Sequence, residues 1–170
     1  PAEMRISDAR LTEYSNLLTR DEPNPAPTQL WNGMIHPFLK MRLRGAIWYQ
    51  GEANAGAPSS YACRFPAMVA DWRSKFGLPD LAFLYVELAA YSQDYSSIRA
   101  AQRAVLSLPL TGFATAIDLG DTTSPEGSIH PRRKQEVARR LALSALAVEY
   151  GAKVGYSGPS FVAASIGGGG

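Results

Sequence analysis

Apolar residues occur along the chain in two patterns, short runs and stripes with helical spacing. The runs lie at 46–49, 81–88 and 112–119, and glycine, proline or polar residues lie beside them. Such short apolar runs are typical of strands that are buried on both faces of a parallel sheet. We therefore predict three strands, the first of which ends at Gly51.

Four other segments carry apolar residues at helical spacing. One stripe runs from Tyr61 to Phe76; Pro66 suits its first turn, and Gly77 suits a C-terminal stop. Pro131 suits the first position of the last helix. The predicted helices cover 29–40, with a bend or end near Pro37, 61–76, 96–108 and 131–150.

Strands and helices therefore alternate along the chain. This order predicts an α/β fold in which parallel strands are joined by right-handed crossovers and helices cover both faces of the sheet. Ligands bind such sheets outside the carboxyl ends of the strands. The rule selects three polar loops for closer inspection, at 50–60, 89–95 and 118–130.

Composition excludes several classes of function. The 170 residues suffice for one domain, and the net charge of +2 has no block of like charges to attract nucleic acid or an anionic membrane. No apolar run reaches the roughly 20 residues that span a bilayer. The chain has one cysteine, Cys63, and two histidines, so neither an internal disulfide nor a zinc cluster is expected.

His130 is the first candidate for chemistry, because it follows the third predicted strand and precedes the last predicted helix. A neutral imidazole at such a helix start can act as a general base near neutral pH. Asp118, Asp121 and, more weakly, Glu126 lie in the same loop and could orient the ring, as an acid does in a catalytic triad. A capping or packed histidine and ordinary turn carboxylates are the alternatives.

The loop after the first strand is the second candidate. Gln50 and Asn54 carry amide donors of the kind that an oxyanion hole needs, and Gly51 allows the backbone to approach a substrate closely. An ordinary turn after a strand is the alternative. Aromatic residues that could stack on a sugar, or pack in the core, lie nearby: Trp48, Tyr49, Tyr91 and Tyr95.

Four segments, in this order, resemble the sialate O-acetylesterase family. They are 30–37 (LWNGMIHP), 45–54 (GAIWYQGEAN), 65–73 (FPAMVADWR) and 128–135 (SIHPRRKQ), within a resemblance that runs from about 28 to 159. The resemblance implies an SGNH-hydrolase fold, which is a flavodoxin-like three-layer α/β/α sandwich. It also implies hydrolysis of O-acetyl esters on sialic acid or another sugar, with no metal and no organic cofactor.

The resemblance also implies roles for individual residues. His130 matches the catalytic histidine of the family, and Gln50 and Gly51 match the block on the oxyanion side of the site. Glu52 and Asn54 match neighbouring positions that hold this block in place. The implied mechanism is serine acyl transfer through an acetyl-enzyme, in which His130 shuttles the proton.

The chain departs from the family at two points. The Gly-Gln-Ser-Asn block that carries the serine nucleophile is absent, and Ser15 lacks the preceding glycine and glutamine. Gly127 and Ser128 stand where many members have an acid, so Asp118, Asp121, Glu126 or a backbone carbonyl must orient the ring. We therefore expect an upstream part of the same protein to supply the nucleophile and the first strand of the sheet, and the 170 residues alone to be inactive.

The chain begins with neither methionine nor a signal peptide and ends in four glycines, which suggests a segment of a longer protein. We expect an N-terminal extension and Pro-rich loop at 1–27, the later part of a hydrolase domain at 28–153, and an exit segment or further module at 154–170. The partners expected are an acetylated carbohydrate and the upstream segment. A secreted, lysosomal or periplasmic location follows from the resemblance alone.

Two other functions fit the same residues. A non-catalytic carbohydrate-binding relative would keep the fold without the chemistry, and Gly127 and Ser128 in place of an acid favour it slightly. An SGNH esterase acting on acetylated plant polysaccharide, such as xylan, is the other alternative.

Overall fold

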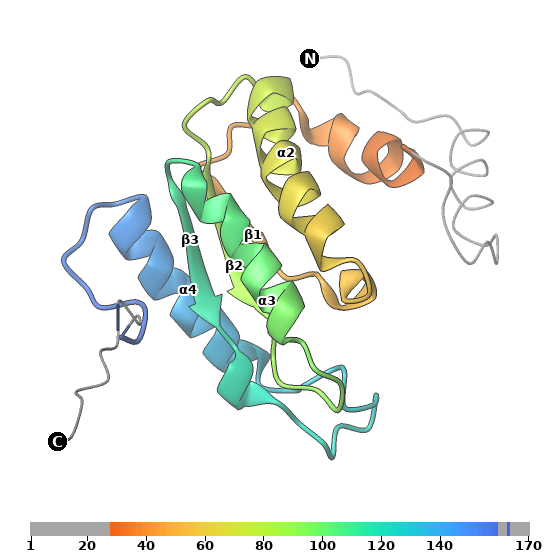
Figure 1. Ribbon diagram of the computed structural model, residues 1–170. Helices are drawn as coiled ribbons and strands as arrows, with labels where there is room; N and C mark the ends of the chain where they lie inside the picture. The colour runs from red at the N-terminus through yellow and green to blue at the C-terminus, as the bar shows by residue number, and fades with distance from the viewer. Residues whose placement is uncertain (1–27, 160–162, 164–170) are drawn as a thin grey trace, which may run out of the picture. The chain divides into compact units, whose positions relative to one another are not determined.

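The computed structural model describes residues 28–159 and 163 (Figure 1). Contacts between Cα atoms divide the chain into two units, residues 1–42 and 43–170. The predicted extension at 1–27 and most of the predicted exit segment lie outside the described residues.

In the first unit, the described residues form two short helical segments. A π-helical turn, η1 (Trp31–Ile35), is followed by a 3-10 turn, η2 (His36–Phe38). Pro37 lies at the start of η2 and has no N–H to continue the preceding turn. The predicted helix with a break near Pro37 is therefore confirmed, although its geometry is irregular.

The second unit is built on a parallel sheet. Its strands are β1 (Gly45–Trp48), β2 (Ala82–Glu87) and β3 (Thr111–Thr115), in the order β1-β2-β3. β2 lies between the other two strands and is buried along its whole length. The three predicted strands and their parallel pairing are confirmed.

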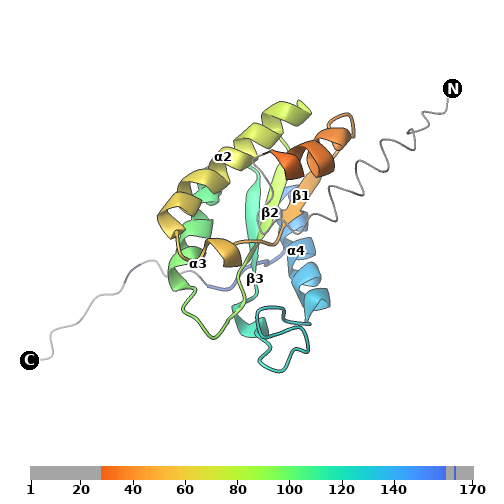
Figure 2. The same ribbon diagram turned by 90° about the vertical axis from the view of Figure 1, so that its right-hand side faces the viewer.

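Helices cover both faces of this sheet. α2 (Pro58–Phe76) and α3 (Ser96–Gln102) lie on one face, and α4 (Lys134–Val148) lies on the other, as the turned view shows (Figure 2). One apolar cluster joins α2 and α3 to the sheet, and a second joins α4 to β2 and β3. The second unit is therefore the three-layer α/β/α sandwich that the alternation of elements predicts.

The ends of α2 follow from its prolines and from one glycine. Pro58 occupies the first turn, where a missing N–H is harmless. Gly77 ends the helix with a φ of +62°, and its N–H donates to the carbonyls of Arg73 and Ser74. The prediction for Gly77 is confirmed. The prediction that Pro66 lies in the first turn is wrong, because the helix begins two turns earlier and Pro66 lies inside it.

The end of β3 and the start of α4 both differ from the predicted bounds. The strand ends at Thr115, and the rest of the predicted run turns into a 3-10 segment, η5 (Ile117–Leu119). The Ala116 N–H makes a last bond to the Glu87 carbonyl before this turn. α4 begins at Lys134, so the prediction that Pro131 opens it is wrong.

β1 was predicted to be buried on both faces, and this is also wrong. Ile47 on β1 is 69% exposed. The reason lies in the position of α4, which packs on β2 and β3 and leaves one face of β1 uncovered. Within the described part of the chain, β1 is therefore an edge strand with an open face.

The close packing of β3 against α4 predicts that Gly112→Ala destabilises the fold. A Cβ atom at Gly112 would lie 2.6 Å from Ser144 Oγ and 2.9 Å from Val148 Cγ2. Overpacking of this kind typically lowers the free energy of unfolding by about 1–3 kcal/mol. Urea denaturation followed by circular dichroism measures the change.

Gly155→Ala is the matched control for this substitution, because no atom lies within 4 Å of a Cβ at that position. We expect its unfolding midpoint to stay at the wild-type value. Equal midpoints for the two variants would contradict the packing of β3 on α4.

Candidate active site

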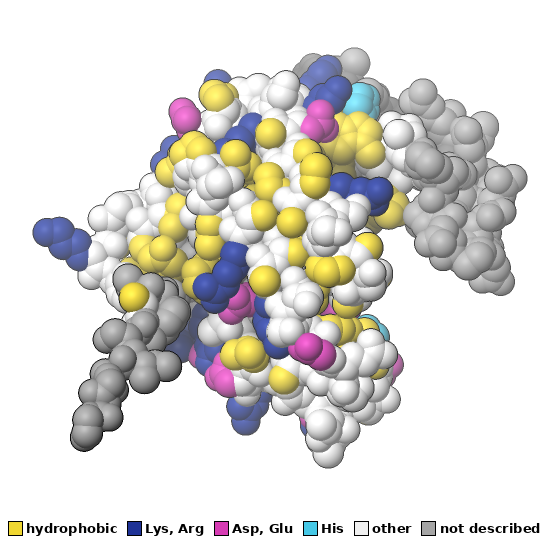
Figure 3. Space-filling view, viewed as in Figure 1, with side chains coloured by type: hydrophobic (Ala, Val, Ile, Leu, Met, Phe, Trp, Pro, Cys, Tyr) yellow, Lys and Arg dark blue, Asp and Glu magenta, His cyan; other side chains and the backbone are white. Residues whose placement is uncertain are grey.

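The loops that follow the three parallel strands lie at the same end of the molecule (Figure 1). They cover residues 49–57, 88–95 and 116–133. Acidic and basic side chains intermix over this half of the surface (Figure 3). The residues singled out from the sequence therefore lie at the edge where parallel sheets bind ligands.

The loop after β1 is fixed by Gly51. Its φ of +147° is one that L side chains rarely adopt, and a Cβ there would lie 3.2 Å from Leu88 Cδ1. The chain then forms a 3-10 turn, η3 (Glu52–Asn54), in which Gln50 Nε2 donates to Asn54 Oδ1 at 2.7 Å. Asn54 thus fixes the orientation of the Gln50 side-chain amide. The second N–H of the Gln50 amide remains available to a ligand.

Gln102 is a site-supporting residue that the sequence analysis missed. It is fully buried at the end of α3, where its Nε2 donates to the carbonyls of Gln50 at 3.2 Å and Val86 at 2.9 Å. Its Oε1 accepts from the Leu88 N–H at 3.1 Å. A usable signal was present, because a glutamine four residues after Ile98 lies on the inward face of the helix.

Glu52 lies within electrostatic reach of three tyrosines. Burial, and then the Glu52 carboxylate, raise the pKa of Tyr49 to about 12. Burial is also the main cause of a raised pKa for Tyr61 and Tyr95, and Glu52 adds to both. The Tyr61 hydroxyl donates to the Gln50 carbonyl at 3.3 Å, whereas the buried Tyr49 hydroxyl has no hydrogen-bond partner among the described residues.

The aromatic residues near the site mainly serve packing. Trp48 makes an edge contact with the Trp72 ring at a centroid distance of 6.0 Å. Tyr95 is 4% exposed, and its ring lies 5.3 Å from that of half-buried Tyr91. The core-packing alternative thus holds for Trp48 and Tyr95.

The loop after β3 returns across the sheet to the end of β1. Lys134, the first residue of α4, places Nζ 4.4 Å from the centre of the Tyr49 ring, which is a cation–π contact. His130 precedes Lys134 by one turn's length of chain. Through this contact, the start of α4 lies beside the residue that precedes Gln50.

His130 is exposed and has a defined hydrogen bond. Its Nδ1 lies 2.9 Å from the backbone carbonyl oxygen of Glu126. A carbonyl oxygen can only accept, so Nδ1 carries the proton of this bond. In the neutral ring, Nε2 is then unprotonated and free to act as a base.

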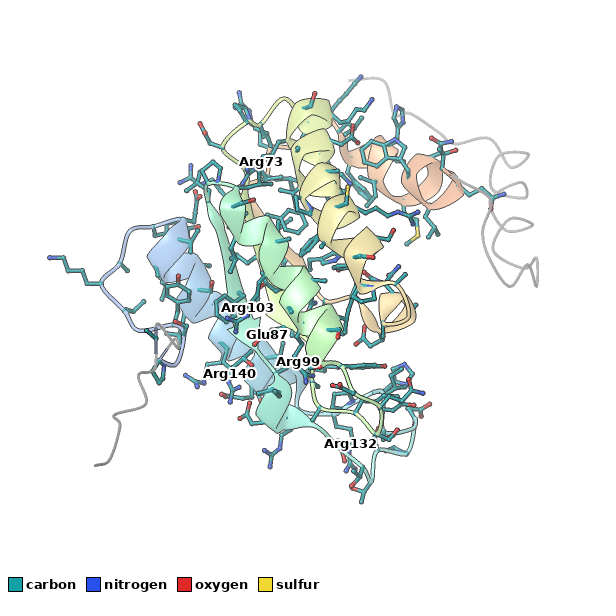
Figure 4. The ribbon with its side chains drawn as sticks, in the orientation of Figure 1. Arg73, Glu87, Arg99, Arg103, Arg132 and Arg140 are labelled. Carbon is teal, nitrogen blue, oxygen red and sulfur yellow. The ribbon has the colours of Figure 1, made fainter. Side chains whose placement is uncertain are left out.

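None of the three carboxylates proposed from the sequence bonds the His130 ring, because Glu126 reaches it with its backbone carbonyl and not with its side chain. Asp118 forms a two-pronged ion pair with Arg140 at 2.6 and 2.8 Å, and Asp121 forms one with Arg132 at 2.6 and 3.1 Å. Figure 4 shows Arg132 in the loop and Arg140 nearer the sheet. Hydrogen bonds from these arginines lower the pKa of both carboxyl groups.

The described part of the chain contains neither a metal-binding cluster nor a membrane-spanning helix. No group of three or more His, Cys, Asp or Glu side chains within 28–159 and 163 is placed to hold a metal ion. No helix in these ranges is long and apolar enough to cross a bilayer. The polar groups gathered at the loop edge are an imidazole, amides, carboxylates and guanidinium groups.

Comparisons with known proteins identify the family. Residues 22–146 match the carbohydrate esterase family described as sialic acid-specific acetylesterase. Sialate O-acetylesterase from Mus musculus is 46% identical over 151 residues, covering 76% of this chain and 28% of the mouse protein. The Homo sapiens sialate O-acetylesterase is 42% identical, covering 76% of this chain and 29% of the human protein.

A solved structure agrees with the sequence relatives. A carbohydrate acetylesterase from Xanthomonas citri superposes with a TM-score of 0.76 at 40% sequence identity, covering 89% of this chain and 36% of that one. The chain thus spans less than a third of the length of the curated relatives. The expected SGNH-type fold and the resemblance are confirmed, and the chain belongs to the family of sialic acid-specific carbohydrate acetylesterases.

Proposed function

We propose that the protein to which this chain belongs removes O-acetyl groups from sialic acid or a related acetylated sugar, by serine acyl transfer with His130 as the general base. The observation that carries the proposal is the bond from His130 Nδ1 to the Glu126 carbonyl. It leaves Nε2 free at the edge of the sheet where the Gln50 block also lies. The family of the chain supports the choice of an acetylated sugar.

The proposed reaction has two halves. Nε2 of His130 takes the proton of a serine hydroxyl as its oxygen attacks the acetyl carbon, and the oxyanion lies against the second N–H of Gln50 and the Gly51 N–H. His130 then gives the proton to the departing sugar oxygen. Water attacks the acetyl-enzyme in the same way and releases acetate.

The serine comes, in this proposal, from a part of the protein outside this chain. Among the described residues, no hydroxyl or thiol is hydrogen-bonded to the His130 ring. Ser124 is near in sequence, but its Oγ donates to the backbone oxygen of His130 at 2.7 Å and so points away from this role. Ser15 lies outside the described residues.

We expect His130→Ala to lower kcat of the full-length protein by about 10³-fold or more, because removal of the base stops proton transfer in both halves of the reaction. Hydrolysis of p-nitrophenyl acetate and of an O-acetylated sialoside measures the change. This 170-residue chain alone should release no acetate from either ester.

The other histidine provides the control. His36 is exposed in η2, and His36→Ala should keep wild-type activity. Activity of this chain alone would mean that it contains a nucleophile, and a full-length protein without activity would favour the carbohydrate-binding alternative.

Gln50→Ala should lower kcat by about 10²-fold with little change in KM, since an oxyanion donor acts mainly in the transition state. Gln93→Ala is the matched control, because Gln93 is an exposed glutamine in the neighbouring loop after β2. Steady-state kinetics with the same two esters separate kcat from KM. A fall confined to KM would assign Gln50 to ground-state sugar binding instead.

A further inference from the structure

We propose that the backbone carbonyl of Glu126 is the group that orients His130, and that Gly127, Asp121 and Arg132 are positioning residues that hold this carbonyl against the ring. This inference rests on the proposed function only in treating His130 as the general base. The geometry of the loop carries the structural part by itself.

The first support is the conformation of Gly127. Its φ is +88°, in a region that L side chains rarely adopt, and no atom lies within 4 Å of a Cβ built there. The Glu126 carbonyl belongs to the peptide that joins Glu126 to Gly127, so this φ sets the direction of the carbonyl relative to His130. The His130 N–H in turn donates to the Gly127 carbonyl at 2.9 Å, which closes the turn.

The second support is the closure of the loop by one ion pair. The Asp121 carboxylate accepts from Arg132 Nε at 2.6 Å, from Arg132 Nη2 at 3.1 Å and from the Arg132 backbone N–H at 3.4 Å. It also accepts from the hydroxyl of Thr123 at 3.1 Å. These bonds join the first and last parts of the segment that contains His130.

The third support is the set of bonds inside the loop. Ser124 Oγ donates to the His130 carbonyl at 2.7 Å, and the Gly127 N–H donates to the Ser124 carbonyl at 3.1 Å. The loop therefore fixes both the backbone of His130 and the peptide that faces its ring. No part of this arrangement requires a carboxylate at positions 127 or 128.

The bond to the Glu126 carbonyl selects the His130 tautomer whose Nε2 can accept a proton. A wrong histidine tautomer costs about 10⁴-fold in kcat in serine proteases whose orienting acid is replaced by its amide. In this loop, a neutral carbonyl performs the orienting step, because Asp118 and Asp121 are already bound to arginines. Asp121 then acts on His130 through Arg132 and the loop backbone.

The tautomer can be measured without any enzymatic activity. The chain contains two histidines, so a ¹⁵N-histidine-labelled sample gives two ring systems, and His36→Ala assigns them. At a pH where the ring is neutral, we expect Nδ1 of His130 to carry the proton. A predominant Nε2–H form, which free histidine side chains prefer, would overturn the proposal.

Two substitutions at Gly127 test the carbonyl. Asparagine tolerates positive φ, whereas the branched side chain of valine does not, and both have open space at this position. Gly127→Asn should keep the Nδ1–H form, and Gly127→Val should lose it. In the full-length protein, Gly127→Val should lower kcat by about 10²-fold or more at nearly unchanged KM. Retention of the Nδ1–H form in the valine variant would contradict the role of the carbonyl.

A second pair of variants tests whether Asp121 acts indirectly. Asp121→Asn and Arg132→Gln should both shift His130 toward the Nε2–H form, because each opens the loop. Asp118→Asn is the matched control, since Asp118 has a similar ion pair with Arg140, and it should leave the tautomer unchanged. If Arg132→Gln keeps the Nδ1–H form while Asp121→Asn loses it, Asp121 orients the ring directly and the proposal fails.

The two readouts separate this inference from the proposed function. If the tautomers are as expected but the full-length protein is inactive, the esterase function is rejected and the proposed orientation of His130 stands. An active protein with the Nε2–H form would reject the orientation alone.

Discussion

The side-chain amide of Gln102 is the interaction on which the arrangement of the site depends. β1 ends at Trp48, so the carbonyl of Gln50 lies beyond the sheet and is bound by side chains, the Gln102 amide and the Tyr61 hydroxyl. The same amide bonds the carbonyl of Val86 and the N–H of Leu88, at the end of β2. A buried polar group left without a partner costs about 1–3 kcal/mol, so this one side chain couples the loop after β1 to the loop after β2.

The two halves of the site are held by different kinds of interaction. The Gln50 block rests on buried groups, namely Gln102 and the partly buried hydroxyl of Tyr61. The His130 loop rests on exposed bonds, chiefly the pair between Asp121 and Arg132. Exposed ion pairs are screened by water and salt, so the loop depends on several weak bonds acting together. The amide side of the site therefore depends on single buried bonds, and the histidine side depends on several exposed bonds that together hold the loop.

Sequence patterns predicted those features that depend on neighbouring residues in the chain. Gly77 ends α2 because a positive φ suits glycine, and this can be inferred from the local stripe alone. The exposure of Ile47 could not be inferred, because it depends on which part of the sheet α4 covers. The orienting contact of His130 is harder still, because every residue has a backbone carbonyl and the Glu126 side chain gives no sign of its use. Only Gly127 carried a local signal for it.

The two edges of the sheet differ in a way that bears on where the nucleophile belongs. At the end of β3, Arg140 of α4 donates to the carbonyl of Thr115 and also pairs with Asp118. This bond occupies a backbone acceptor that a further strand paired with β3 would need. β1 instead presents the apolar side chain of Ile47 on an open face. A strand that brings a serine to this site would therefore pair best with β1, and its carboxyl end would then lie beside the Gln50 block.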